Sequence, residues 1–174
     1  MRQRRAERER LRAREFEKFV AGAGGRLLHA AALLTAEPPE RCPAAERLLV
    51  GALARTYADW DRLRGEDPYD RARQELTARF AWSAWRYRRP RPEPVPVAVS
   101  GGLLERLTPQ ERLVLVLRLY EGIAEEQAAA LLGLPVERVR AICTRAVAVM
   151  RAARRAAALP SRSPSRSRSP EAAS

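Results

Sequence analysis

Arginines on one predicted helix are the side chains of this chain best suited to recognition chemistry. The helix begins at Val136, directly after the turn Gly133-Leu134-Pro135, and one of its sides is an apolar stripe. The opposite side carries small, polar and basic residues: Arg138, Arg140, Ala141, Thr144 and Arg145. A guanidinium group donates paired hydrogen bonds to phosphates and to guanine edges, so this side predicts contact with the major groove of duplex DNA.

Catalytic and metal chemistry lack the residues that they require. The chain has two cysteines, Cys42 and Cys143, and one histidine, His29, too few for a four-ligand zinc site or a disulfide framework. His29 lies in an apolar helical run, where a packed histidine is more common than a catalytic one. Neither a GxxxxGKS/T loop nor a GxGxxG loop is present. We therefore expect no enzyme activity, no metal and no cofactor.

The arginine-bearing helix belongs to a predicted helix-turn-helix. A short helix spans Glu125–Leu132, and Gly133 supplies the turn before the second helix. Apolar residues recur on the second helix at steps of three and four: Val136, Val139, Cys143, Ala146 and Met150. Upstream, the capping box Thr108-Pro109-Gln110-Glu111 opens a further helix. In DNA-binding forms the second helix enters the major groove, whereas the structural alternative is a helical hairpin that only packs.

The remaining elements are also helical, so the fold class is all-α. Residues 1–15 form a basic N-terminal arm, and residues 16–89 form a first small helical domain, with Asp67 as the N-cap of its third helix. Residues 90–102 are a Pro-rich linker, and residues 103–159 form the helix-turn-helix domain. Residues 160–174 are a Ser/Arg/Pro tail that we expect to be disordered.

The net charge of +12 is concentrated in a few segments of the 174-residue chain. Residues 79–91 hold five arginines and no acid, and residues 137–155 hold six arginines and one glutamate. Such patches favour an acidic partner, with nucleic acid first and an anionic membrane surface second. The longest apolar stretch is far short of a membrane span, and no secretory signal is evident, so we expect a cytoplasmic protein without membrane insertion.

Two sets of segments resemble a known family. Leu107–Glu121, Ala128–Gly133 and Val136–Arg140 resemble region 4 of bacterial RNA polymerase sigma factors, with the extracytoplasmic-function (ECF) group as the nearest type. Phe16–Val20, Leu33–Thr35, Ala45–Glu46, Ala52–Tyr57 and Trp60–Arg62 resemble region 2 of the same group. The resemblance implies that region 4 reads the −35 promoter element and that region 2 melts and holds the −10 element. It implies promoter DNA, RNA polymerase core and an anti-sigma factor as partners.

The resemblance also assigns two further groups of residues. Aromatic rings stack on unpaired bases while arginines follow phosphates, which suits capture of the −10 strand by Trp82, Trp85, Arg86, Tyr87, Arg88 and Arg89. We expect Phe80 and one of the two tryptophans to lie in the core instead. The segment that would contact core polymerase is divergent and comprises Glu46, Arg47, Val50 and Gly51. After Glu46 the family usually has Asp-Leu-Val-Gln-Glu, where this chain has Arg47-Leu48-Leu49-Val50-Gly51.

Three functions fit these observations. The first is an ECF-type sigma factor that directs polymerase to promoters. The second is a degenerate sigma-like regulator that binds DNA without productive binding to core polymerase. The third is a helical adaptor that docks an acidic protein through its arginines.

Overall fold

The computed structural model describes residues 2–38, 40–63, 65–86 and 102–158, with the side chains of Trp85 and Arg86 left out. Nearly all of the predicted linker, 90–102, and the predicted tail, 160–174, lie outside these residues. The described residues form helices and no strand, in agreement with the all-α prediction. The element order is α1 (Arg2–Thr35), α2 (Pro43–Ala58), η1 (Trp60–Arg62), α3 (Pro68–Arg86), η2 (Leu103–Arg106), α4 (Pro109–Leu115), η3 (Val116–Tyr120), α5 (Glu125–Leu132) and α6 (Val136–Ala158).

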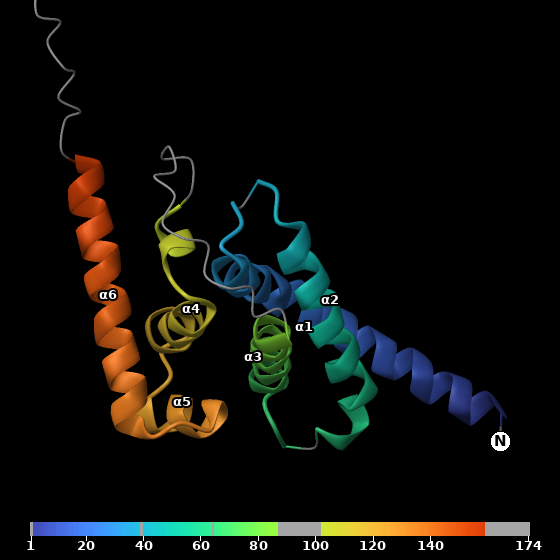
Figure 1. Cartoon of the computed structure of the whole chain (residues 1–174). Helices are drawn as coiled ribbons and strands as arrows, with labels where there is room; N and C mark the ends of the chain where they lie inside the picture. The colour runs from blue at the N-terminus through green and yellow to red at the C-terminus, as the bar shows by residue number, and fades with distance from the viewer. Residues whose placement is uncertain (1, 39, 64, 87–101, 159–174) are drawn as a thin grey trace, which may run out of the picture.

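Helices α1, α2 and α3 pack around a shared apolar centre (Figure 1). Leu27, Leu34 and Leu76 are fully buried there, and Ala52 of α2 belongs to the same cluster. The start of α3 follows the sequence prediction, because Pro68 is its first residue and the Asp67 Oδ1 atom accepts a 2.9 Å hydrogen bond from the Tyr69 N–H. This side-chain acceptor satisfies one of the helix's unpaired N–H groups.

A side chain in the turn between α1 and α2 caps the start of α2. The Glu37 carboxylate accepts hydrogen bonds from the N–H groups of Ala44 (3.1 Å) and Ala45 (2.8 Å) and from the Thr35 hydroxyl (3.1 Å). Burial would raise the pKa of Glu37, but these hydrogen bonds outweigh it and lower the pKa. The ionised carboxylate therefore fixes the turn between α1 and α2.

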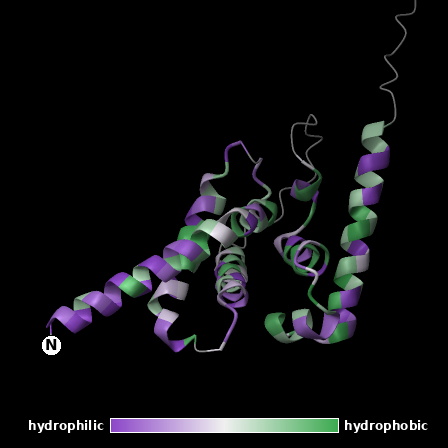
Figure 2. Ribbon diagram, turned by 180° about the vertical axis from the view of Figure 1, so that it is seen from behind, coloured by the Kyte–Doolittle hydropathy of each residue, from purple (hydrophilic) through white to green (hydrophobic). Residues whose placement is uncertain are grey.

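Helix α1 is far longer than its packed part. The ring centre of Phe16 lies 4.8 and 5.1 Å from those of Tyr57 and Trp60, and the first fully buried residue of the helix is Leu27. Residues 2–10 are all exposed, and this end of the helix projects from the bundle as a hydrophilic rod (Figures 1 and 2). The basic N-terminal arm is therefore helical and continuous with the first helix of the bundle.

The second half of the chain builds the expected helix-turn-helix. The capping box is present at α4, where the Glu111 N–H donates to the Thr108 hydroxyl and the Thr108 N–H donates to the Glu111 carboxylate. Helix α5 has the predicted bounds, and Gly133 ends it in the left-handed region with φ 62°. That conformation favours glycine because a Cβ atom would clash with the backbone.

The two halves of the chain share one buried cluster. Leu76 and Phe80 of α3 belong to the same apolar cluster as Leu113 and Leu117 of the second half. A polar contact lies beside it, because the Glu121 side chain is only 1% exposed and accepts from the Tyr69 hydroxyl at 2.9 Å and from Arg26 at 3.3 Å. Burial and the hydrogen bond to Glu121 raise the pKa of Tyr69, which keeps its hydroxyl protonated as a donor.

Candidate nucleic-acid interface

Helix α6 buries one side against the bundle, which leaves its opposite side facing solvent. Val139, Ile142 and Ala146 are at most 1% exposed and pack into the bundle. The five residues predicted to contact the major groove are all exposed: Arg138, Arg140, Ala141, Thr144 and Arg145. Because α6 is one uninterrupted helix, these side chains are held at fixed spacings on a single surface.

Two of the three arginines on this surface are held by carboxylates from neighbouring helices. Arg145 donates from Nε to the Glu111 Oε1 atom at 2.7 Å, and the Arg140 guanidinium contacts Glu125 Oε2 at 2.8 Å. The arginine side chains stay 58% and 61% exposed, whereas the Glu111 side chain is 6% exposed. The carboxylates therefore orient the guanidinium groups from the side of the neighbouring helices and leave their solvent-facing edges accessible.

Arg138 differs from these two, because it forms no ion pair within the described residues. The surface thus combines two guanidinium groups held by carboxylates with a third, on Arg138, that is exposed. Oriented groups suit recognition at defined positions, since less rotamer entropy is lost when they bind. An unpaired arginine suits a phosphate.

Glu111 is a site residue that the sequence analysis did not identify as one. Burial would raise its pKa, but the Thr108 N–H, Arg145 and the Thr108 hydroxyl all donate to the carboxylate and lower the pKa. One carboxylate therefore caps α4 through Oε2 and orients Arg145 through Oε1. The capping-box motif marked its position in the sequence, but the partner 34 residues away was not visible there.

The aromatic and basic cluster at the end of α3 is only partly described. Phe80 is 7% exposed and lies in the core, as predicted, whereas Trp82 is 60% exposed at the surface. The backbone of Trp85 and Arg86 continues α3, but their side chains lie outside the described residues. Tyr87, Arg88 and Arg89 lie outside them entirely. The expectation that one of the two tryptophans is buried depends on the Trp85 side chain and stays a prediction.

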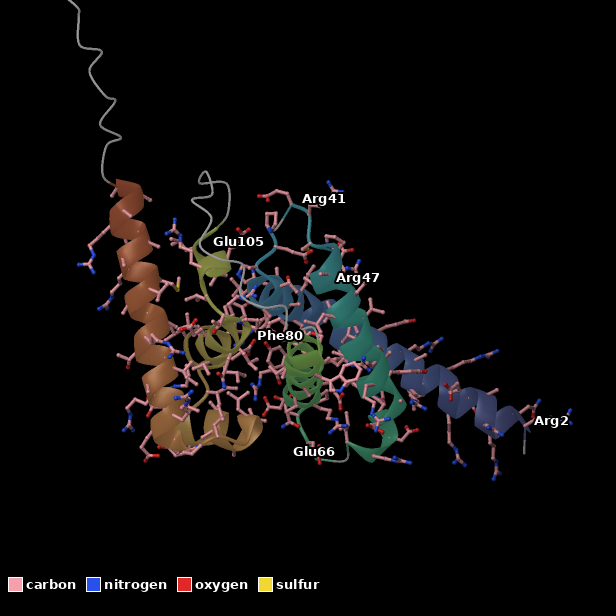
Figure 3. The ribbon with its side chains drawn as sticks, viewed as in Figure 1. Arg2, Arg41, Arg47, Glu66, Phe80 and Glu105 are labelled. Carbon is pink, nitrogen blue, oxygen red and sulfur yellow. The ribbon has the colours of Figure 1, made fainter. Side chains whose placement is uncertain are left out.

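The segment predicted to contact core polymerase lies on the outer side of α2. Glu46, Arg47 and Val50 are exposed, with Val50 at 65%, and Arg47 is visible on that side in Figure 3. Gly51 faces α3, where a Cβ atom would lie 2.9 Å from Nη1 of Arg79. A side chain at Gly51 would therefore displace the Arg79 guanidinium, which is the flexible end of a long side chain.

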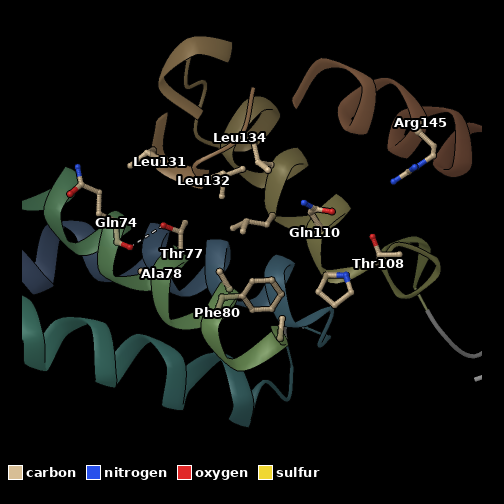
Figure 4. Close-up of a pocket in the computed structure, with 14 residues that line it drawn as sticks. Gln74, Thr77, Ala78, Phe80, Thr108, Gln110, Leu131, Leu132, Leu134 and Arg145 are labelled. Atoms are coloured by element: carbon tan, nitrogen blue, oxygen red, sulfur yellow. Dashed lines mark hydrogen bonds between the residues drawn. The ribbon is translucent and has the colours of Figure 1, made fainter. Parts of the chain in front are cut away.

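A cleft of about 920 Å³ separates α3 from the helix-turn-helix. Phe80 lines one wall, Leu132 and Leu134 line the other, and Thr108 and Arg145 lie at one end (Figure 4).

Among the described residues, no group of histidine, cysteine and acidic side chains has the arrangement of a metal site. None of the described helices combines the length and apolar character that a membrane span requires.

Comparisons with known proteins agree on one family. The family described as Sigma-70, region 4 matches residues 103–152. The RNA polymerase sigma-E factor of Streptomyces avermitilis is 32% identical over 156 residues, covering 79% of this chain and 83% of the relative. The sigma-E factor of Streptomyces coelicolor is 31% identical, covering 79% of this chain and 84% of the relative. The sigma factor RpoE of Bartonella quintana, solved in complex with the anti-sigma factor NepR, has the same fold, with a TM-score of 0.61 at 18% identity, covering 81% of this chain and 97% of that one.

Proposed function

The chain belongs to the ECF group of the sigma-70 family of RNA polymerase sigma factors, and we propose that α6 reads the −35 promoter element while the end of α3 holds the melted −10 strand. Sigma factors are transcription initiation factors that direct RNA polymerase to promoters, and they are not enzymes. In this proposal residues 103–159 act as region 4 and residues 16–89 act as region 2. The two halves would bind promoter segments separated along one duplex.

The oriented arginine surface of α6 carries the −35 proposal. An α-helix fits the major groove, and the arginines near the start of α6 would meet base edges and phosphates there. Arg140 and Arg145 are aimed by Glu125 and Glu111, which are acidic residues of the same half. This arrangement favours DNA recognition over a hairpin that only packs, because packing alone does not require exposed guanidinium groups.

Exposure of Trp82 supports the −10 proposal. A tryptophan that is 60% exposed in the last part of a helix presents a ring surface on which an unpaired base can stack. The neighbouring Arg86, Arg88 and Arg89 would follow the phosphates of the captured strand. Tyr87 and Trp85 add further rings in the same short segment.

Partner binding forms the third part of the proposal. We propose that core polymerase contacts the outer side of α2 through Glu46, Arg47 and Val50, with Gly51 at its edge. The chemistry of this segment departs from the usual family pattern, which favours a second candidate function: a sigma-like regulator that binds DNA without productive binding to core. We also propose an anti-sigma partner, since the solved structural neighbour was crystallised with one, and a site of action in the cytoplasm.

Reconstitution with purified core polymerase tests these proposals. A DNA fragment enriched from host genomic DNA by the protein, with and without core polymerase, would be footprinted and transcribed with the wild-type protein and its variants. We expect Arg138→Ala with Arg140→Ala to abolish protection at −35, and Trp82→Ala to slow strand opening while −35 protection persists. Unchanged footprints in both variants would refute the assignments. DNA binding without a polymerase-dependent transcript would support the second candidate, and the variant Arg47→Asp, Val50→Gln, Gly51→Glu should then gain core affinity.

A further inference from the structure

The projecting end of α1 is a charged rod with no counterpart in the assignments above. We define the basic arm as residues 2–14, which contain seven arginines and two glutamates. The arm leaves the bundle and points into solvent, with its side chains radiating from the helix (Figures 1 and 3). Concentrated charge of one sign on an exposed helix is costly to the isolated chain, because like charges repel one another.

The part of the arm nearest the bundle is held by contacts with Tyr57 and Asp61. Arg12 lies 4.3 Å from the centre of the Tyr57 ring and 3.4 Å from the Asp61 carboxylate. The Tyr57 hydroxyl also donates to Glu9 at 3.1 Å. Together with the ring cluster around Phe16, these contacts fix the direction in which the arm leaves the bundle.

The arginines beyond this anchor have no ion-pair partner within the described residues. They are Arg2, Arg4, Arg5, Arg8, Arg10 and Arg14, and all are exposed. Glu7 and Glu9 are the two acids of the arm, against its seven arginines, and neither forms an ion pair within the described residues. The arm therefore presents a row of available guanidinium groups on a helix whose direction is fixed.

The arrangement of these arginines favours duplex DNA as the partner. At 3.6 residues per turn, Arg4 and Arg8 lie on one flank of the helix and Arg10 and Arg14 on another, about 120° apart. Leu11 and Glu7 lie on the line between the two pairs, and the six residues together line a shallow groove. A helix about 10–12 Å wide fits a major groove about 12 Å wide, where it is flanked by two phosphate walls.

A protein partner fits the arm less well. Protein interfaces are built on an apolar centre with aromatic anchors, and charged residues are depleted there. The arm offers one large apolar side chain, Leu11, at 59% exposure, and no aromatic residue.

We propose that the basic arm is an additional DNA-binding element, which holds the phosphates of duplex DNA independently of α6 and of the end of α3.

Salt dependence of DNA binding tests this proposal. The full-length chain would be titrated with fluorescent duplex DNA between about 50 and 200 mM salt, and the slope of log affinity against log salt compared between variants. The arm variant changes Arg4, Arg8, Arg10 and Arg14 to glutamine, which preserves helix propensity. If all four arginines meet phosphates, the slope should become shallower by about 3.6, so that the loss of affinity over this salt range shrinks by roughly 100-fold.

Two control variants separate specific contacts from general charge. A variant with lysine at the same four positions keeps the charge and should retain most of the salt slope. A second variant removes the same charge from exposed sites outside the arm, at Arg41, Arg55, Arg62 and Arg106. Asp59 then loses its contacts with Arg55 and Arg62, at 3.3 and 3.7 Å, but keeps its 3.0 Å contact with Arg71. This second variant should change the slope by less than half as much as the arm variant.

Three results would overturn the proposal. Equal slopes for the arm variant and the wild-type protein would mean that the arm is only solvated. Equal changes in the arm variant and the distant-charge variant would mean that net charge alone acts. An unchanged DNA slope combined with weaker binding to core polymerase would assign the arm to an acidic protein surface. Circular dichroism of each variant verifies that the helices are retained.

Discussion

Replacement of Glu111 by glutamine should separate its two roles, which are to cap the start of α4 and to orient the Arg145 side chain. Glutamine still accepts the hydrogen bond from the Thr108 N–H, because the capping box tolerates glutamine at this position. Its second terminal group is an NH2 donor in place of the Oε1 atom, so it cannot accept from the Arg145 Nε–H, and the 2.7 Å hydrogen bond is lost. Loss of this charge-assisted hydrogen bond costs about 1 kcal/mol, at the lower end of such values, because the Arg145 side chain is 58% exposed and its freed donor can bind water.

Urea denaturation of the full chain at neutral pH measures this loss. A cost of about 1 kcal/mol lowers the midpoint by roughly 0.5 M for an m-value of about 2 kcal/mol/M. The matched control is Arg145→Gln, and the double variant closes a thermodynamic cycle. The coupling between the two residues should be about 0.5–1 kcal/mol.

The pH dependence gives an independent check of the same contact. The pKa of Glu111 is lower in the folded chain than in the unfolded one, so its stabilising effect is complete above the ordinary carboxyl pKa of about 4.3. The effect is lost as the pH falls through the lower folded value. The difference between wild type and Glu111→Gln should therefore narrow below about pH 4. A coupling near zero, or a difference that persists undiminished in acid, would refute this account of Glu111.

Three further substitutions probe single contacts, each measured by urea denaturation. Tyr69→Phe removes the hydroxyl that donates to the buried Glu121 carboxylate at 2.9 Å and should cost about 1–3 kcal/mol; no loss would mean that water replaces the donor. Asp67→Ala removes the cap of α3 and should cost about 1 kcal/mol, with Asp67→Asn nearly neutral; equal losses in the two would point to charge instead of capping. Gly133→Ala forces a Cβ atom into a backbone with φ 62° and should cost about 1 kcal/mol, whereas stabilisation would contradict the left-handed turn.

Local signals in the sequence predicted most of the helical architecture. The capping box at Thr108, the N-cap at Asp67 and the turn at Gly133 each act over a few residues, and the structure contains all three. The apolar spacing also predicted which side of α6 faces solvent, because burial of Val139 and Ala146 fixes the rotation of that helix. Motif resemblance identified the family for the same reason, since its motifs are short and contiguous.

Contacts between distant residues were decided only by the tertiary structure. Arg145 and Glu111 are 34 positions apart, and Glu121 meets Tyr69 across 52 positions, so neither pair follows from helical periodicity. The sequence predicted two small helical domains, and the apolar cluster that contains both Leu76 and Leu117 does not follow from the spacing within either one. Local rules of capping and amphipathicity fix where each helix begins and which side it buries. They do not fix which helix covers that side, because packing depends on the shape and charge of residues brought together from the whole chain.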